Sequence, residues 1–385
     1  MAGGKLEELR AYLRQQPVML ALLAGLAVIF FLAVTGLSRA YQAQRESLGS
    51  RWFSRGVTDL KAERFASAVT EFRSALLYSP DDYSYQLNLA EALIGLKRTA
   101  EASTYLVNLW DREPEDGVVN LELARIAVQK GQTEQAQRYY HNAIYATWSG
   151  DQPDDQEGKR REARLELIEF LLRTNARARA ESELIALAEN VGEDSAQQQQ
   201  VGNLFVRTLD YERAYVAYRL SLKSERHNRA ALAGAGLAAF ELARYPEAHR
   251  YLQSAVAADS DDAESAALLK TTDLVLEMDP FQRQMSTAQR NRIVVEAFAA
   301  AGERIKACGA QKSSAAAKSG QPNLTESWAT MKPRVTAGGL QRNPDLVESA
   351  MDLVFEIERE TSVSCGAPAG RDQALLLIAK LHEGN

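Results

Sequence analysis

The chain has 385 residues, of which 46% are hydrophobic and 25% charged, and its formal net charge is −6 at pH 7. This length suffices for a folded core, and the scarcity of β-branched runs predicts an almost entirely helical, all-α protein. Residues 51–280 carry a net charge of −10, which argues against nucleic-acid binding, because that binding needs clustered Lys and Arg.

The amino terminus begins with a short segment, 1–16, followed by an apolar run at 17–37 that contains no charged residue. At about 1.5 Å per residue this run is about 32 Å long, enough for a hydrocarbon core of about 30 Å. We expect a single transmembrane helix at 17–37 that contacts the lipid bilayer, followed by a helical linker at 38–48. A cleaved secretory signal is the alternative, although its apolar core is usually shorter.

Basic residues flank the run almost equally, so the positive-inside rule does not decide the orientation; they are Lys5, Arg10 and Arg14 before it, and Arg39, Arg45 and Arg51 after it. A short leading segment is easily kept in the cytoplasm. We therefore expect a single-pass protein of a bacterial-type inner membrane, with its C-terminal part on the extracytoplasmic side. Repeats that face the cytoplasm remain the alternative.

Two columns of small or apolar residues recur along the chain at steps of 34, 34, 44, 34 and 34 residues. The first column is Ala68, Ala102, Ala136, Ala180, Ala214 and Ala248. The second is Gly56, Ala90, Ala124, Ile168, Gly202 and Gly236. A 34-residue period is typical of stacked helix–turn–helix repeats, in which small residues let neighbouring helices approach.

With the closing prolines Pro80 and Pro114, this pattern resembles the tetratricopeptide repeat (TPR). The resemblance implies an α-solenoid of about six helix pairs, with repeats 1–3 at 49–148 and repeats 4–6 at 161–262. The one 44-residue step contains ten extra residues rich in Gly, Asp, Gln and Pro, so we expect an inserted loop at 149–160.

In this family the first helices of the repeats form a concave groove that holds a peptide or helix of another protein, and no catalysis is implied. The resemblance transfers this groove to Phe53, Val57, Leu87, Glu91, Leu121, Arg125, Leu165, Glu169, Asn203 and Arg207. Many of these side chains would equally suit packing between helices. The Asn and basic residues with which some relatives clamp a terminal carboxylate are not evident.

Beyond the repeats we expect a capping helix at 263–280, because an open solenoid end needs a cover. A helical C-terminal domain is expected at 281–385, with helices near 281–307, 345–362 and 371–381. A low-complexity stretch of Ala, Lys, Ser and Gly predicts a flexible loop at 309–322.

Cys308 and Cys365 are the two cysteines of the chain, and both lie in its last fifth. They fit a disulfide formed in an oxidising compartment; two reduced thiols in the cytoplasm are the alternative. No Cys-x-x-Cys motif exists and the four histidines are scattered, so we expect no metal site and no cofactor.

These features predict a membrane-anchored scaffold or adaptor, not an enzyme, that binds protein partners and supports assembly or chaperoning of a complex at the membrane. An extracytoplasmic quality-control or redox-linked factor that acts through the cysteine-containing domain is the alternative. The apolar run has no Gly-x-x-x-Gly pair, so the sequence does not indicate an oligomeric state.

Overall fold

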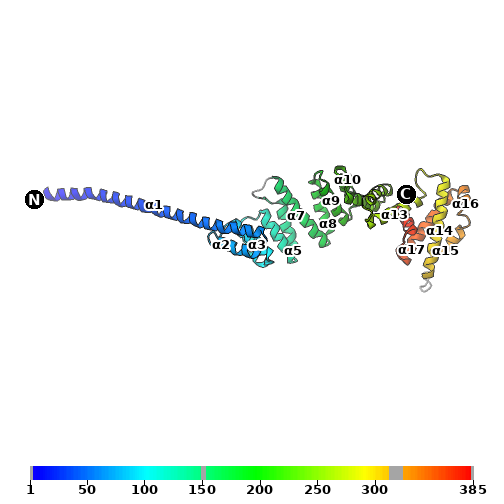
Figure 1. Cartoon of the computed structure of the whole chain (residues 1–385), viewed down its shortest axis with the longest axis horizontal. Coiled ribbons are helices and arrows are strands. Elements are labelled where there is room, and N and C mark those ends of the chain that lie inside the picture. The colour runs from blue at the N-terminus through cyan, green and yellow to red at the C-terminus, as the bar shows by residue number, and fades with distance from the viewer. Residues whose placement is uncertain (1–2, 149–152, 312–323, 383–385) are drawn as a thin grey trace. The chain divides into compact units, whose positions relative to one another are not determined.

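A computed structural model describes residues 3–148, 153–311 and 324–382, and the regular elements of these ranges are all helices (Figure 1). The predicted all-α fold is confirmed. The chain divides into two compact units, Met1–Phe170 and Leu171–Asn385.

The first unit consists of three helix pairs and the beginning of a fourth. Its helices are α1 (Gly3–Lys61), α2 (Phe65–Leu76), α3 (Tyr83–Gly95), α4 (Thr99–Arg112), α5 (Gly117–Gln129), α6 (Thr133–Tyr145) and α7 (Pro153–Arg173). The division between the units falls inside the last turn of α7.

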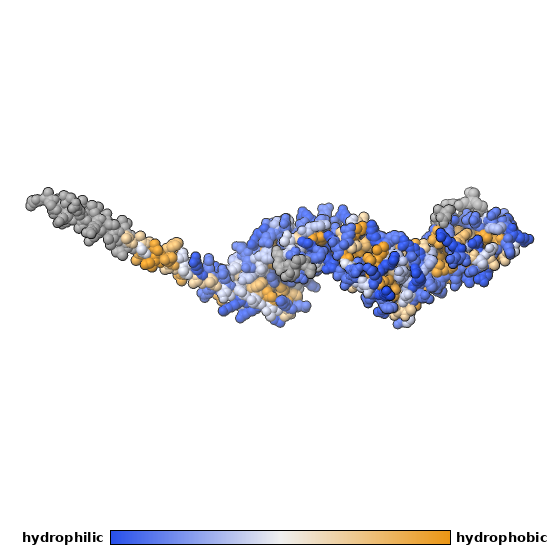
Figure 2. All heavy atoms as spheres, turned by 90° about the horizontal axis from the view of Figure 1, so that it is seen from above, coloured by the Kyte–Doolittle hydropathy of each residue, from blue (hydrophilic) through white to orange (hydrophobic). Residues whose placement is uncertain are grey.

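Helix α1 combines four predicted segments in one uninterrupted helix: most of the N-terminal segment, the apolar run, the linker and the first helix of repeat 1. No proline occurs between Val18 and Lys61 to break it. Among the described residues, α1 is the helix that could cross a membrane by length and composition, within Leu23–Lys61, although a signal sequence passes the same test. Large apolar side chains there are solvent-exposed, among them Phe30 and Phe31, and form a band on α1 (Figure 2).

The second unit contains the remaining repeat helices and the C-terminal helices. They are α8 (Arg177–Glu189), α9 (Ser195–Thr208), α10 (Tyr211–Ser224), α11 (Arg229–Glu241), α12 (Tyr245–Ala258), α13 (Ala263–Met278), α14 (Thr287–Gln311), α15 (Leu324–Met331), α16 (Ala337–Arg342), α17 (Asp345–Cys365) and α18 (Arg371–Leu381).

A left-handed residue between the two helices marks each of the six repeats. These residues have φ between 55° and 70° and follow the same steps of 34 and 44; they are Glu63, Lys97, Gly131, Asn175, Leu209 and Ala243. In each turn the next backbone N–H returns to a carbonyl five residues earlier, as Asp210 N does to Phe205 O at 3.0 Å. This hydrogen bond closes the end of the first helix, so the turn geometry supports the repeat boundaries independently of the sequence columns.

The small-residue columns have the packing role that the sequence predicts. All six column alanines are completely buried. A Cβ atom added to Gly202 would lie 2.7 Å from Cε1 of Tyr218, a distance that real side chains do not tolerate. Helix α9 therefore approaches α10 closely because residue 202 has no side chain.

The predicted inserted loop at 149–160 is wrong for residues 153–160, since α7 already begins at Pro153. Proline suits the first turn of a helix, where its missing N–H costs nothing. The residues that follow it form a helical extension, in which Asp155 and Glu157 are exposed and Lys159 and Arg160 are half-buried. Residues 149–152 lie outside the described part of the chain.

Helix α13 continues the repeat register beyond the sixth pair. Aspartate or asparagine side chains cap first helices at corresponding positions by accepting backbone N–H groups: Asp82, Asp116, Asp194, Asn228 and Asp262. α13 thus starts like the first helix of another repeat, in the segment for which the sequence predicts a capping helix.

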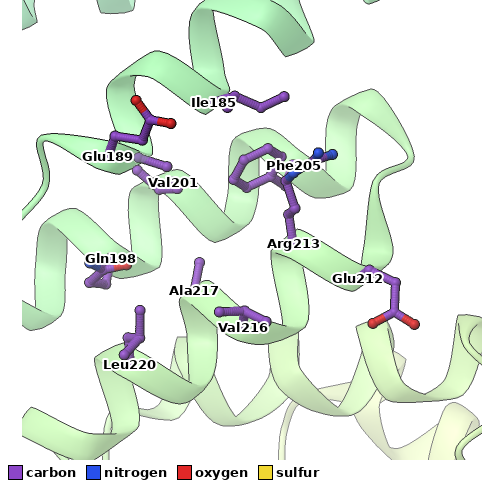
Figure 3. A pocket seen from close by; sticks show the side chains of 11 residues that line it. Ile185, Glu189, Gln198, Val201, Phe205, Glu212, Arg213, Val216, Ala217 and Leu220 are labelled. Carbon is purple, nitrogen blue, oxygen red and sulfur yellow. The ribbon is translucent and has the colours of Figure 1, made fainter.

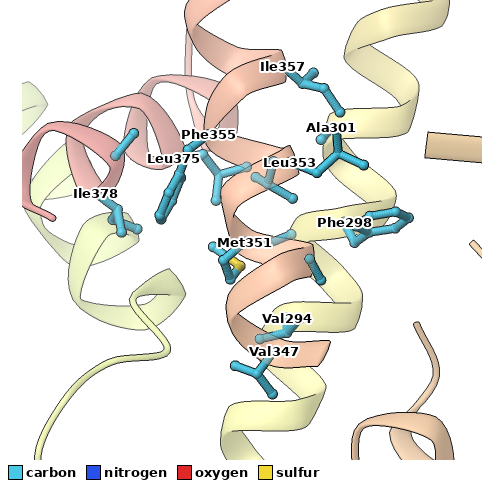
Figure 4. Close-up of a cluster of buried hydrophobic side chains, with 14 of the residues drawn as sticks. Val294, Phe298, Ala301, Val347, Met351, Leu353, Phe355, Ile357, Leu375 and Ile378 are labelled. Carbon is cyan, nitrogen blue, oxygen red and sulfur yellow. The ribbon is translucent and has the colours of Figure 1, made fainter. Parts of the chain in front are cut away.

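The C-terminal helices share one hydrophobic core with the end of the repeats. Val294 and Phe298 of α14, Met351 of α17 and Ile378 of α18 meet in this core (Figure 4), which also includes Tyr245 of the sixth repeat. The 281–385 segment is therefore not packed as a separate core.

Some predicted C-terminal boundaries are wrong. α14 starts at Thr287 rather than 281 and continues through 309–311, where a loop was predicted; residues 312–322 of that predicted loop lie outside the described residues. Helices α15 and α16 were not predicted. The last predicted helix, 371–381, coincides with α18.

Candidate functional site

In the first unit, the first helices of the repeats are α3, α5, α7 and the C-terminal part of α1. The candidate site is the exposed side of these four helices. Each contributes two predicted residues spaced four apart, so each pair lies on one side of its helix. These residues are Phe53 and Val57, Leu87 and Glu91, Leu121 and Arg125, and Leu165 and Glu169.

The part of this surface on α1 and α3 is apolar. The ring of Phe53 stacks on Tyr85 at 4.8 Å between centroids and lies 5.7 Å from Phe72. Phe53, Val57 and Leu87 are half-buried against the core of the unit. They retain exposed apolar area that a partner could cover.

The part on α5 and α7 is dominated by charge. The guanidinium of Arg125 donates to Glu122 Oε1 at 2.5 Å, Glu162 Oε1 at 2.9 Å and Glu166 Oε1 at 2.5 Å. With Glu91 nearby on α3 this group has four carboxylates and one guanidinium, and we call it the carboxylate cluster. Its excess of negative charge makes it a surface for a cationic group.

Burial and mutual repulsion affect the protonation of the cluster. Burial raises the pKa of Glu122, and Arg125 counteracts this by attraction. The pKa of Glu91 is raised first by burial and second by the charge of Glu122. Burial lowers the pKa of Arg125, but the hydrogen bond to Glu166 and the charge of Glu122 outweigh it, so the net shift is upward. A cation bound here would relieve the repulsion between the carboxylates.

Not all predicted groove residues are available to a partner. Leu121 is only 5% exposed and belongs to the interior, whereas Leu165 and Glu169 are half-buried. Asn203 and Arg207 are exposed on α9 in the second unit, where Asn203 Oδ1 accepts a hydrogen bond of 2.8 Å from the Tyr218 hydroxyl.

Sequence reasoning missed Glu122, Glu162 and Glu166. The two glutamates of α7 are one helical turn apart, which places them on one side of the helix. Both glutamates lie within the predicted repeat 4, which starts at residue 161, but only the fold shows that they contact Arg125 of α5.

The second candidate feature, the cysteine pair, forms a disulfide that joins Cys308 in the last turn of α14 to Cys365 at the end of α17. The Cα atoms are 5.7 Å apart. Cys308 is 7% exposed and Cys365 is half-buried. The burial of Cys308 favours a structural bridge, because redox-active cysteines need an accessible thiolate. Within the described ranges no group of three or more His, Cys, Asp or Glu side chains is arranged to hold a metal ion.

The six helix pairs with matching turns define a helical repeat protein. The family model described as tetratricopeptide repeat matches residues 53–115, which include α2, α3 and α4. The TPR resemblance is confirmed for this part of the chain. None of the curated proteins matches the chain.

Several solved structures are similar to the chain at low identity. YrrB, described as a TPR protein with an unusual peptide-binding site, is 14% identical with a TM-score of 0.40, covering 51% of this chain and 95% of YrrB. PilF of Pseudomonas aeruginosa is 14% identical with a TM-score of 0.41, and the match covers 58% of this chain and 97% of the PilF chain. The C-terminal part of a TPR protein of Cytophaga hutchinsonii is 11% identical with a TM-score of 0.44, and the match covers 81% of this chain and 98% of that chain.

Proposed function

We propose that the protein is a membrane-anchored scaffold that holds a segment of a partner protein on the exposed surface of α1, α3, α5 and α7, and so supports assembly or chaperoning of a complex at the membrane. One observation carries this proposal. The exposed apolar band and the groove residues Phe53 and Val57 belong to the same continuous helix.

A continuous helix sets the distance between the bilayer and the groove. From Leu37, at the end of the apolar run, to Phe53 the helix advances 16 residues, or about 24 Å at 1.5 Å per residue. A partner segment in the groove would therefore be held close to the membrane surface. Such a position suits a partner that is itself a membrane protein or is inserted there.

The groove chemistry indicates the kind of segment that would bind. Phe53, Val57 and Leu87 favour apolar side chains, and the carboxylate cluster around Arg125 favours Lys or Arg. A helix or extended peptide with an apolar part followed by basic residues satisfies both. Charge repulsion disfavours nucleic acid.

The Cys308–Cys365 disulfide supports an extracytoplasmic position of the C-terminal part, because such bonds persist in oxidising compartments. With a short N-terminal segment in the cytoplasm, the repeats would then face outward from a bacterial-type inner membrane. The redox-linked alternative receives no support from the buried Cys308.

The experiment is in-cell cross-linking followed by purification in detergent and identification of the bound proteins. The groove variant combines Leu87→Arg with Glu91→Lys. Both residues lie on α3; Leu87 is half-buried and Glu91 is exposed. Leu121 is avoided because an arginine there would be buried. The matched control, Val107→Arg with Asp111→Lys, introduces the same change of charge, at the same four-residue spacing, at exposed positions of neighbouring α4.

We expect the wild type and the α4 control to retrieve the same partners, and the folded groove variant to lose them. Equal retrieval by all three proteins, with unchanged melting temperatures, would contradict a role of this groove.

A further inference from the structure

An apolar hollow of about 380 Å³ lies in the second unit between α8, α9 and α10 (Figure 3). Val201 and Phe205 of α9 form part of its lining, together with Ile185 of α8 and Val216 and Leu220 of α10. Residues two apart on a helix point about 200° away from each other. The hollow is therefore on the side of α9 opposite to the predicted groove residue Asn203.

Ala188, which also lines the hollow, provides a reason for the empty space. The other five repeats have a large apolar residue at the equivalent position of the second helix: Leu76, Trp110, Ile144, Leu222 and Val256. A methyl group at this position in α8 leaves the volume of a large side chain unfilled.

Val216 and Leu220 also depart from the repeat pattern. They are 54% and 41% exposed. At the Val216 position the other repeats carry Thr70, Thr104, Arg138, Ser182 and Arg250. At the Leu220 position they carry Ser74, Asn108, Asn142, Ala186 and Ser254. The fifth repeat therefore exposes two large aliphatic side chains to solvent, one helical turn apart. The other repeats have polar or small residues at these positions.

The charged groups around the hollow leave an excess of negative charge at one edge. Arg213 is paired with Asp210 and with Glu181 at 3.2 Å, and Glu212 is paired with Arg244 at 2.8 Å. Glu189 is exposed and has no ion pair or hydrogen bond from its carboxylate to any described residue. It is the last residue of α8, at the negative end of the helix dipole, where a cation is favoured.

We propose that this hollow is a second docking site, distinct from the groove of the first unit, for an amphipathic helix of a partner protein. Two aliphatic side chains of that helix, one turn apart, enter the space beside Ala188 and contact Val216 and Leu220. A Lys or Arg at the edge of the same helix pairs with Glu189. The unpaired carboxylate selects a basic amphipathic helix over an acidic one.

The test uses the full-length chain in lipid nanodiscs, so that no free detergent competes for the hollow. The probe is a synthetic, fluorescently labelled Ala- and Gln-based helical peptide with leucines three and four positions apart on one side and lysines at the edge. A second peptide has glutamates in place of the lysines. Fluorescence anisotropy measures the affinity of each.

Three variants report on the site. Val216→Thr with Leu220→Ser copies Thr70 and Ser74 of the first repeat, and Ala188→Leu restores the large residue of the other repeats. We expect each to weaken binding of the lysine peptide about tenfold or more without loss of helicity, as removal of central apolar contacts does. Glu189→Lys should reverse the preference so that the glutamate peptide binds better. Val107→Thr on α4, an exposed valine outside the hollow, is the control and should bind as the wild type does.

Three outcomes would overturn the proposal. The first is that the wild type does not bind the lysine peptide, and the second is that Ala188→Leu, while folded, binds it undiminished. The third is self-association of the wild type, measured by sedimentation, that the Val216→Thr and Leu220→Ser pair abolishes. This result would assign the hollow to a second copy of the chain.

Discussion

Arg125 on α5 and Glu166 on α7 are 41 residues apart in sequence, yet Nη2 of the arginine lies 2.5 Å from Oε1 of the glutamate. Oε2 of the same glutamate accepts a hydrogen bond of 3.1 Å from the Tyr140 hydroxyl on α6. The pair therefore joins three consecutive helices across the ten-residue insertion that separates the third repeat from the fourth.

Replacing Arg125 by Ala should destabilise the first unit, because Glu122, Glu162 and Glu166 would then repel one another without a cation between them. We expect a loss of about 1–3 kcal/mol at pH 7, below the value for fully buried pairs because the Arg125 side chain is 34% exposed. The loss should shrink towards pH 4, because burial raises the pKa of Glu122 and protonation of this carboxylate removes one of the repelling charges. Urea unfolding at both pH values measures it.

Arg226→Ala, at an exposed arginine in a turn, is the control and should change stability little. If the Arg125→Ala variant is as stable as this control at pH 7, the arginine does not stabilise the first unit through the carboxylate cluster.

The left-handed turn residues predict a reciprocal pair of substitutions. Leu209 has φ = 67° and an exposed side chain, so Leu209→Gly should stabilise the protein by about 1 kcal/mol. Gly131 has φ = 70° at the equivalent position, so Gly131→Ala should destabilise it by a similar amount. Thermal unfolding followed by circular dichroism checks both; shifts of the same sign would contradict the turn geometry.

Removing the disulfide tests the role of the C-terminal helices. The bond closes a loop of 57 residues, for which chain entropy predicts about 4 kcal/mol of stabilisation. Cys308→Ser with Cys365→Ser should therefore lower the melting temperature of the second unit while the cross-linked partners are retained. Loss of function with melting unchanged would instead support the redox-linked alternative.

Glu358 predicts a pH dependence of stability. Its side chain is completely buried on α17, and its carboxylate oxygens have no hydrogen-bond partner among the described residues. Burial, followed by the charge of Asp372 on α18, raises its pKa to about 8, although Arg304 on α14 acts in the opposite direction. In the unfolded chain a glutamate has a pKa of about 4.3.

Because the folded state holds this proton more tightly, the contribution of Glu358 to stability is fully present below about pH 4.3 and is lost as the pH rises to about 8. Glu358→Gln should remove this loss. We expect little difference from wild type at pH 4 and a gain of roughly 1–4 kcal/mol at pH 9. Glu360→Gln, an exposed neighbour on α17, should leave the pH profile of the unfolding midpoint unchanged.

The anchor is tested by the mass of the purified protein. An uncleaved anchor keeps the apolar run of α1, so the intact mass and the first peptides should include residues before Leu37. A chain that starts after this run would identify a cleaved signal instead. Labelling intact cells with an impermeant maleimide, with and without reductant, then reports the side of the membrane on which Cys308 and Cys365 lie.

Local sequence patterns predicted the repeat fold well where the pattern repeats. The 34-residue columns indicated six helix pairs, and the buried alanines and left-handed turn residues agree with them. The patterns failed where segments do not repeat. α15 and α16 have 8 and 6 residues, too few for clear helical periodicity.

The repeat alignment predicts which side of each helix the proposed groove residues occupy, but not their exposure or their charged neighbours. Equivalent positions in each repeat identified Arg125 and Glu91, whereas nothing in the repeat pattern indicates that Glu162 and Glu166 of α7 contact Arg125 of α5. Leu121 occupies a groove position by alignment but is buried. Alignment reports which side of a helix a residue occupies, and neighbouring side chains decide how much of it water reaches.

By itself the sequence determined the all-helical class, the repeat period and the apolar stretch of α1, because each depends on spacing along one chain. For the two cysteines it left two alternatives, of which a disulfide was one. Only the tertiary structure decided that Arg125 gathers carboxylates from two helices, that Ala188 leaves a hollow beside Val216, and that Glu358 is enclosed without a partner. These properties depend on which side chains from distant segments share a small volume, and helix packing alone sets that.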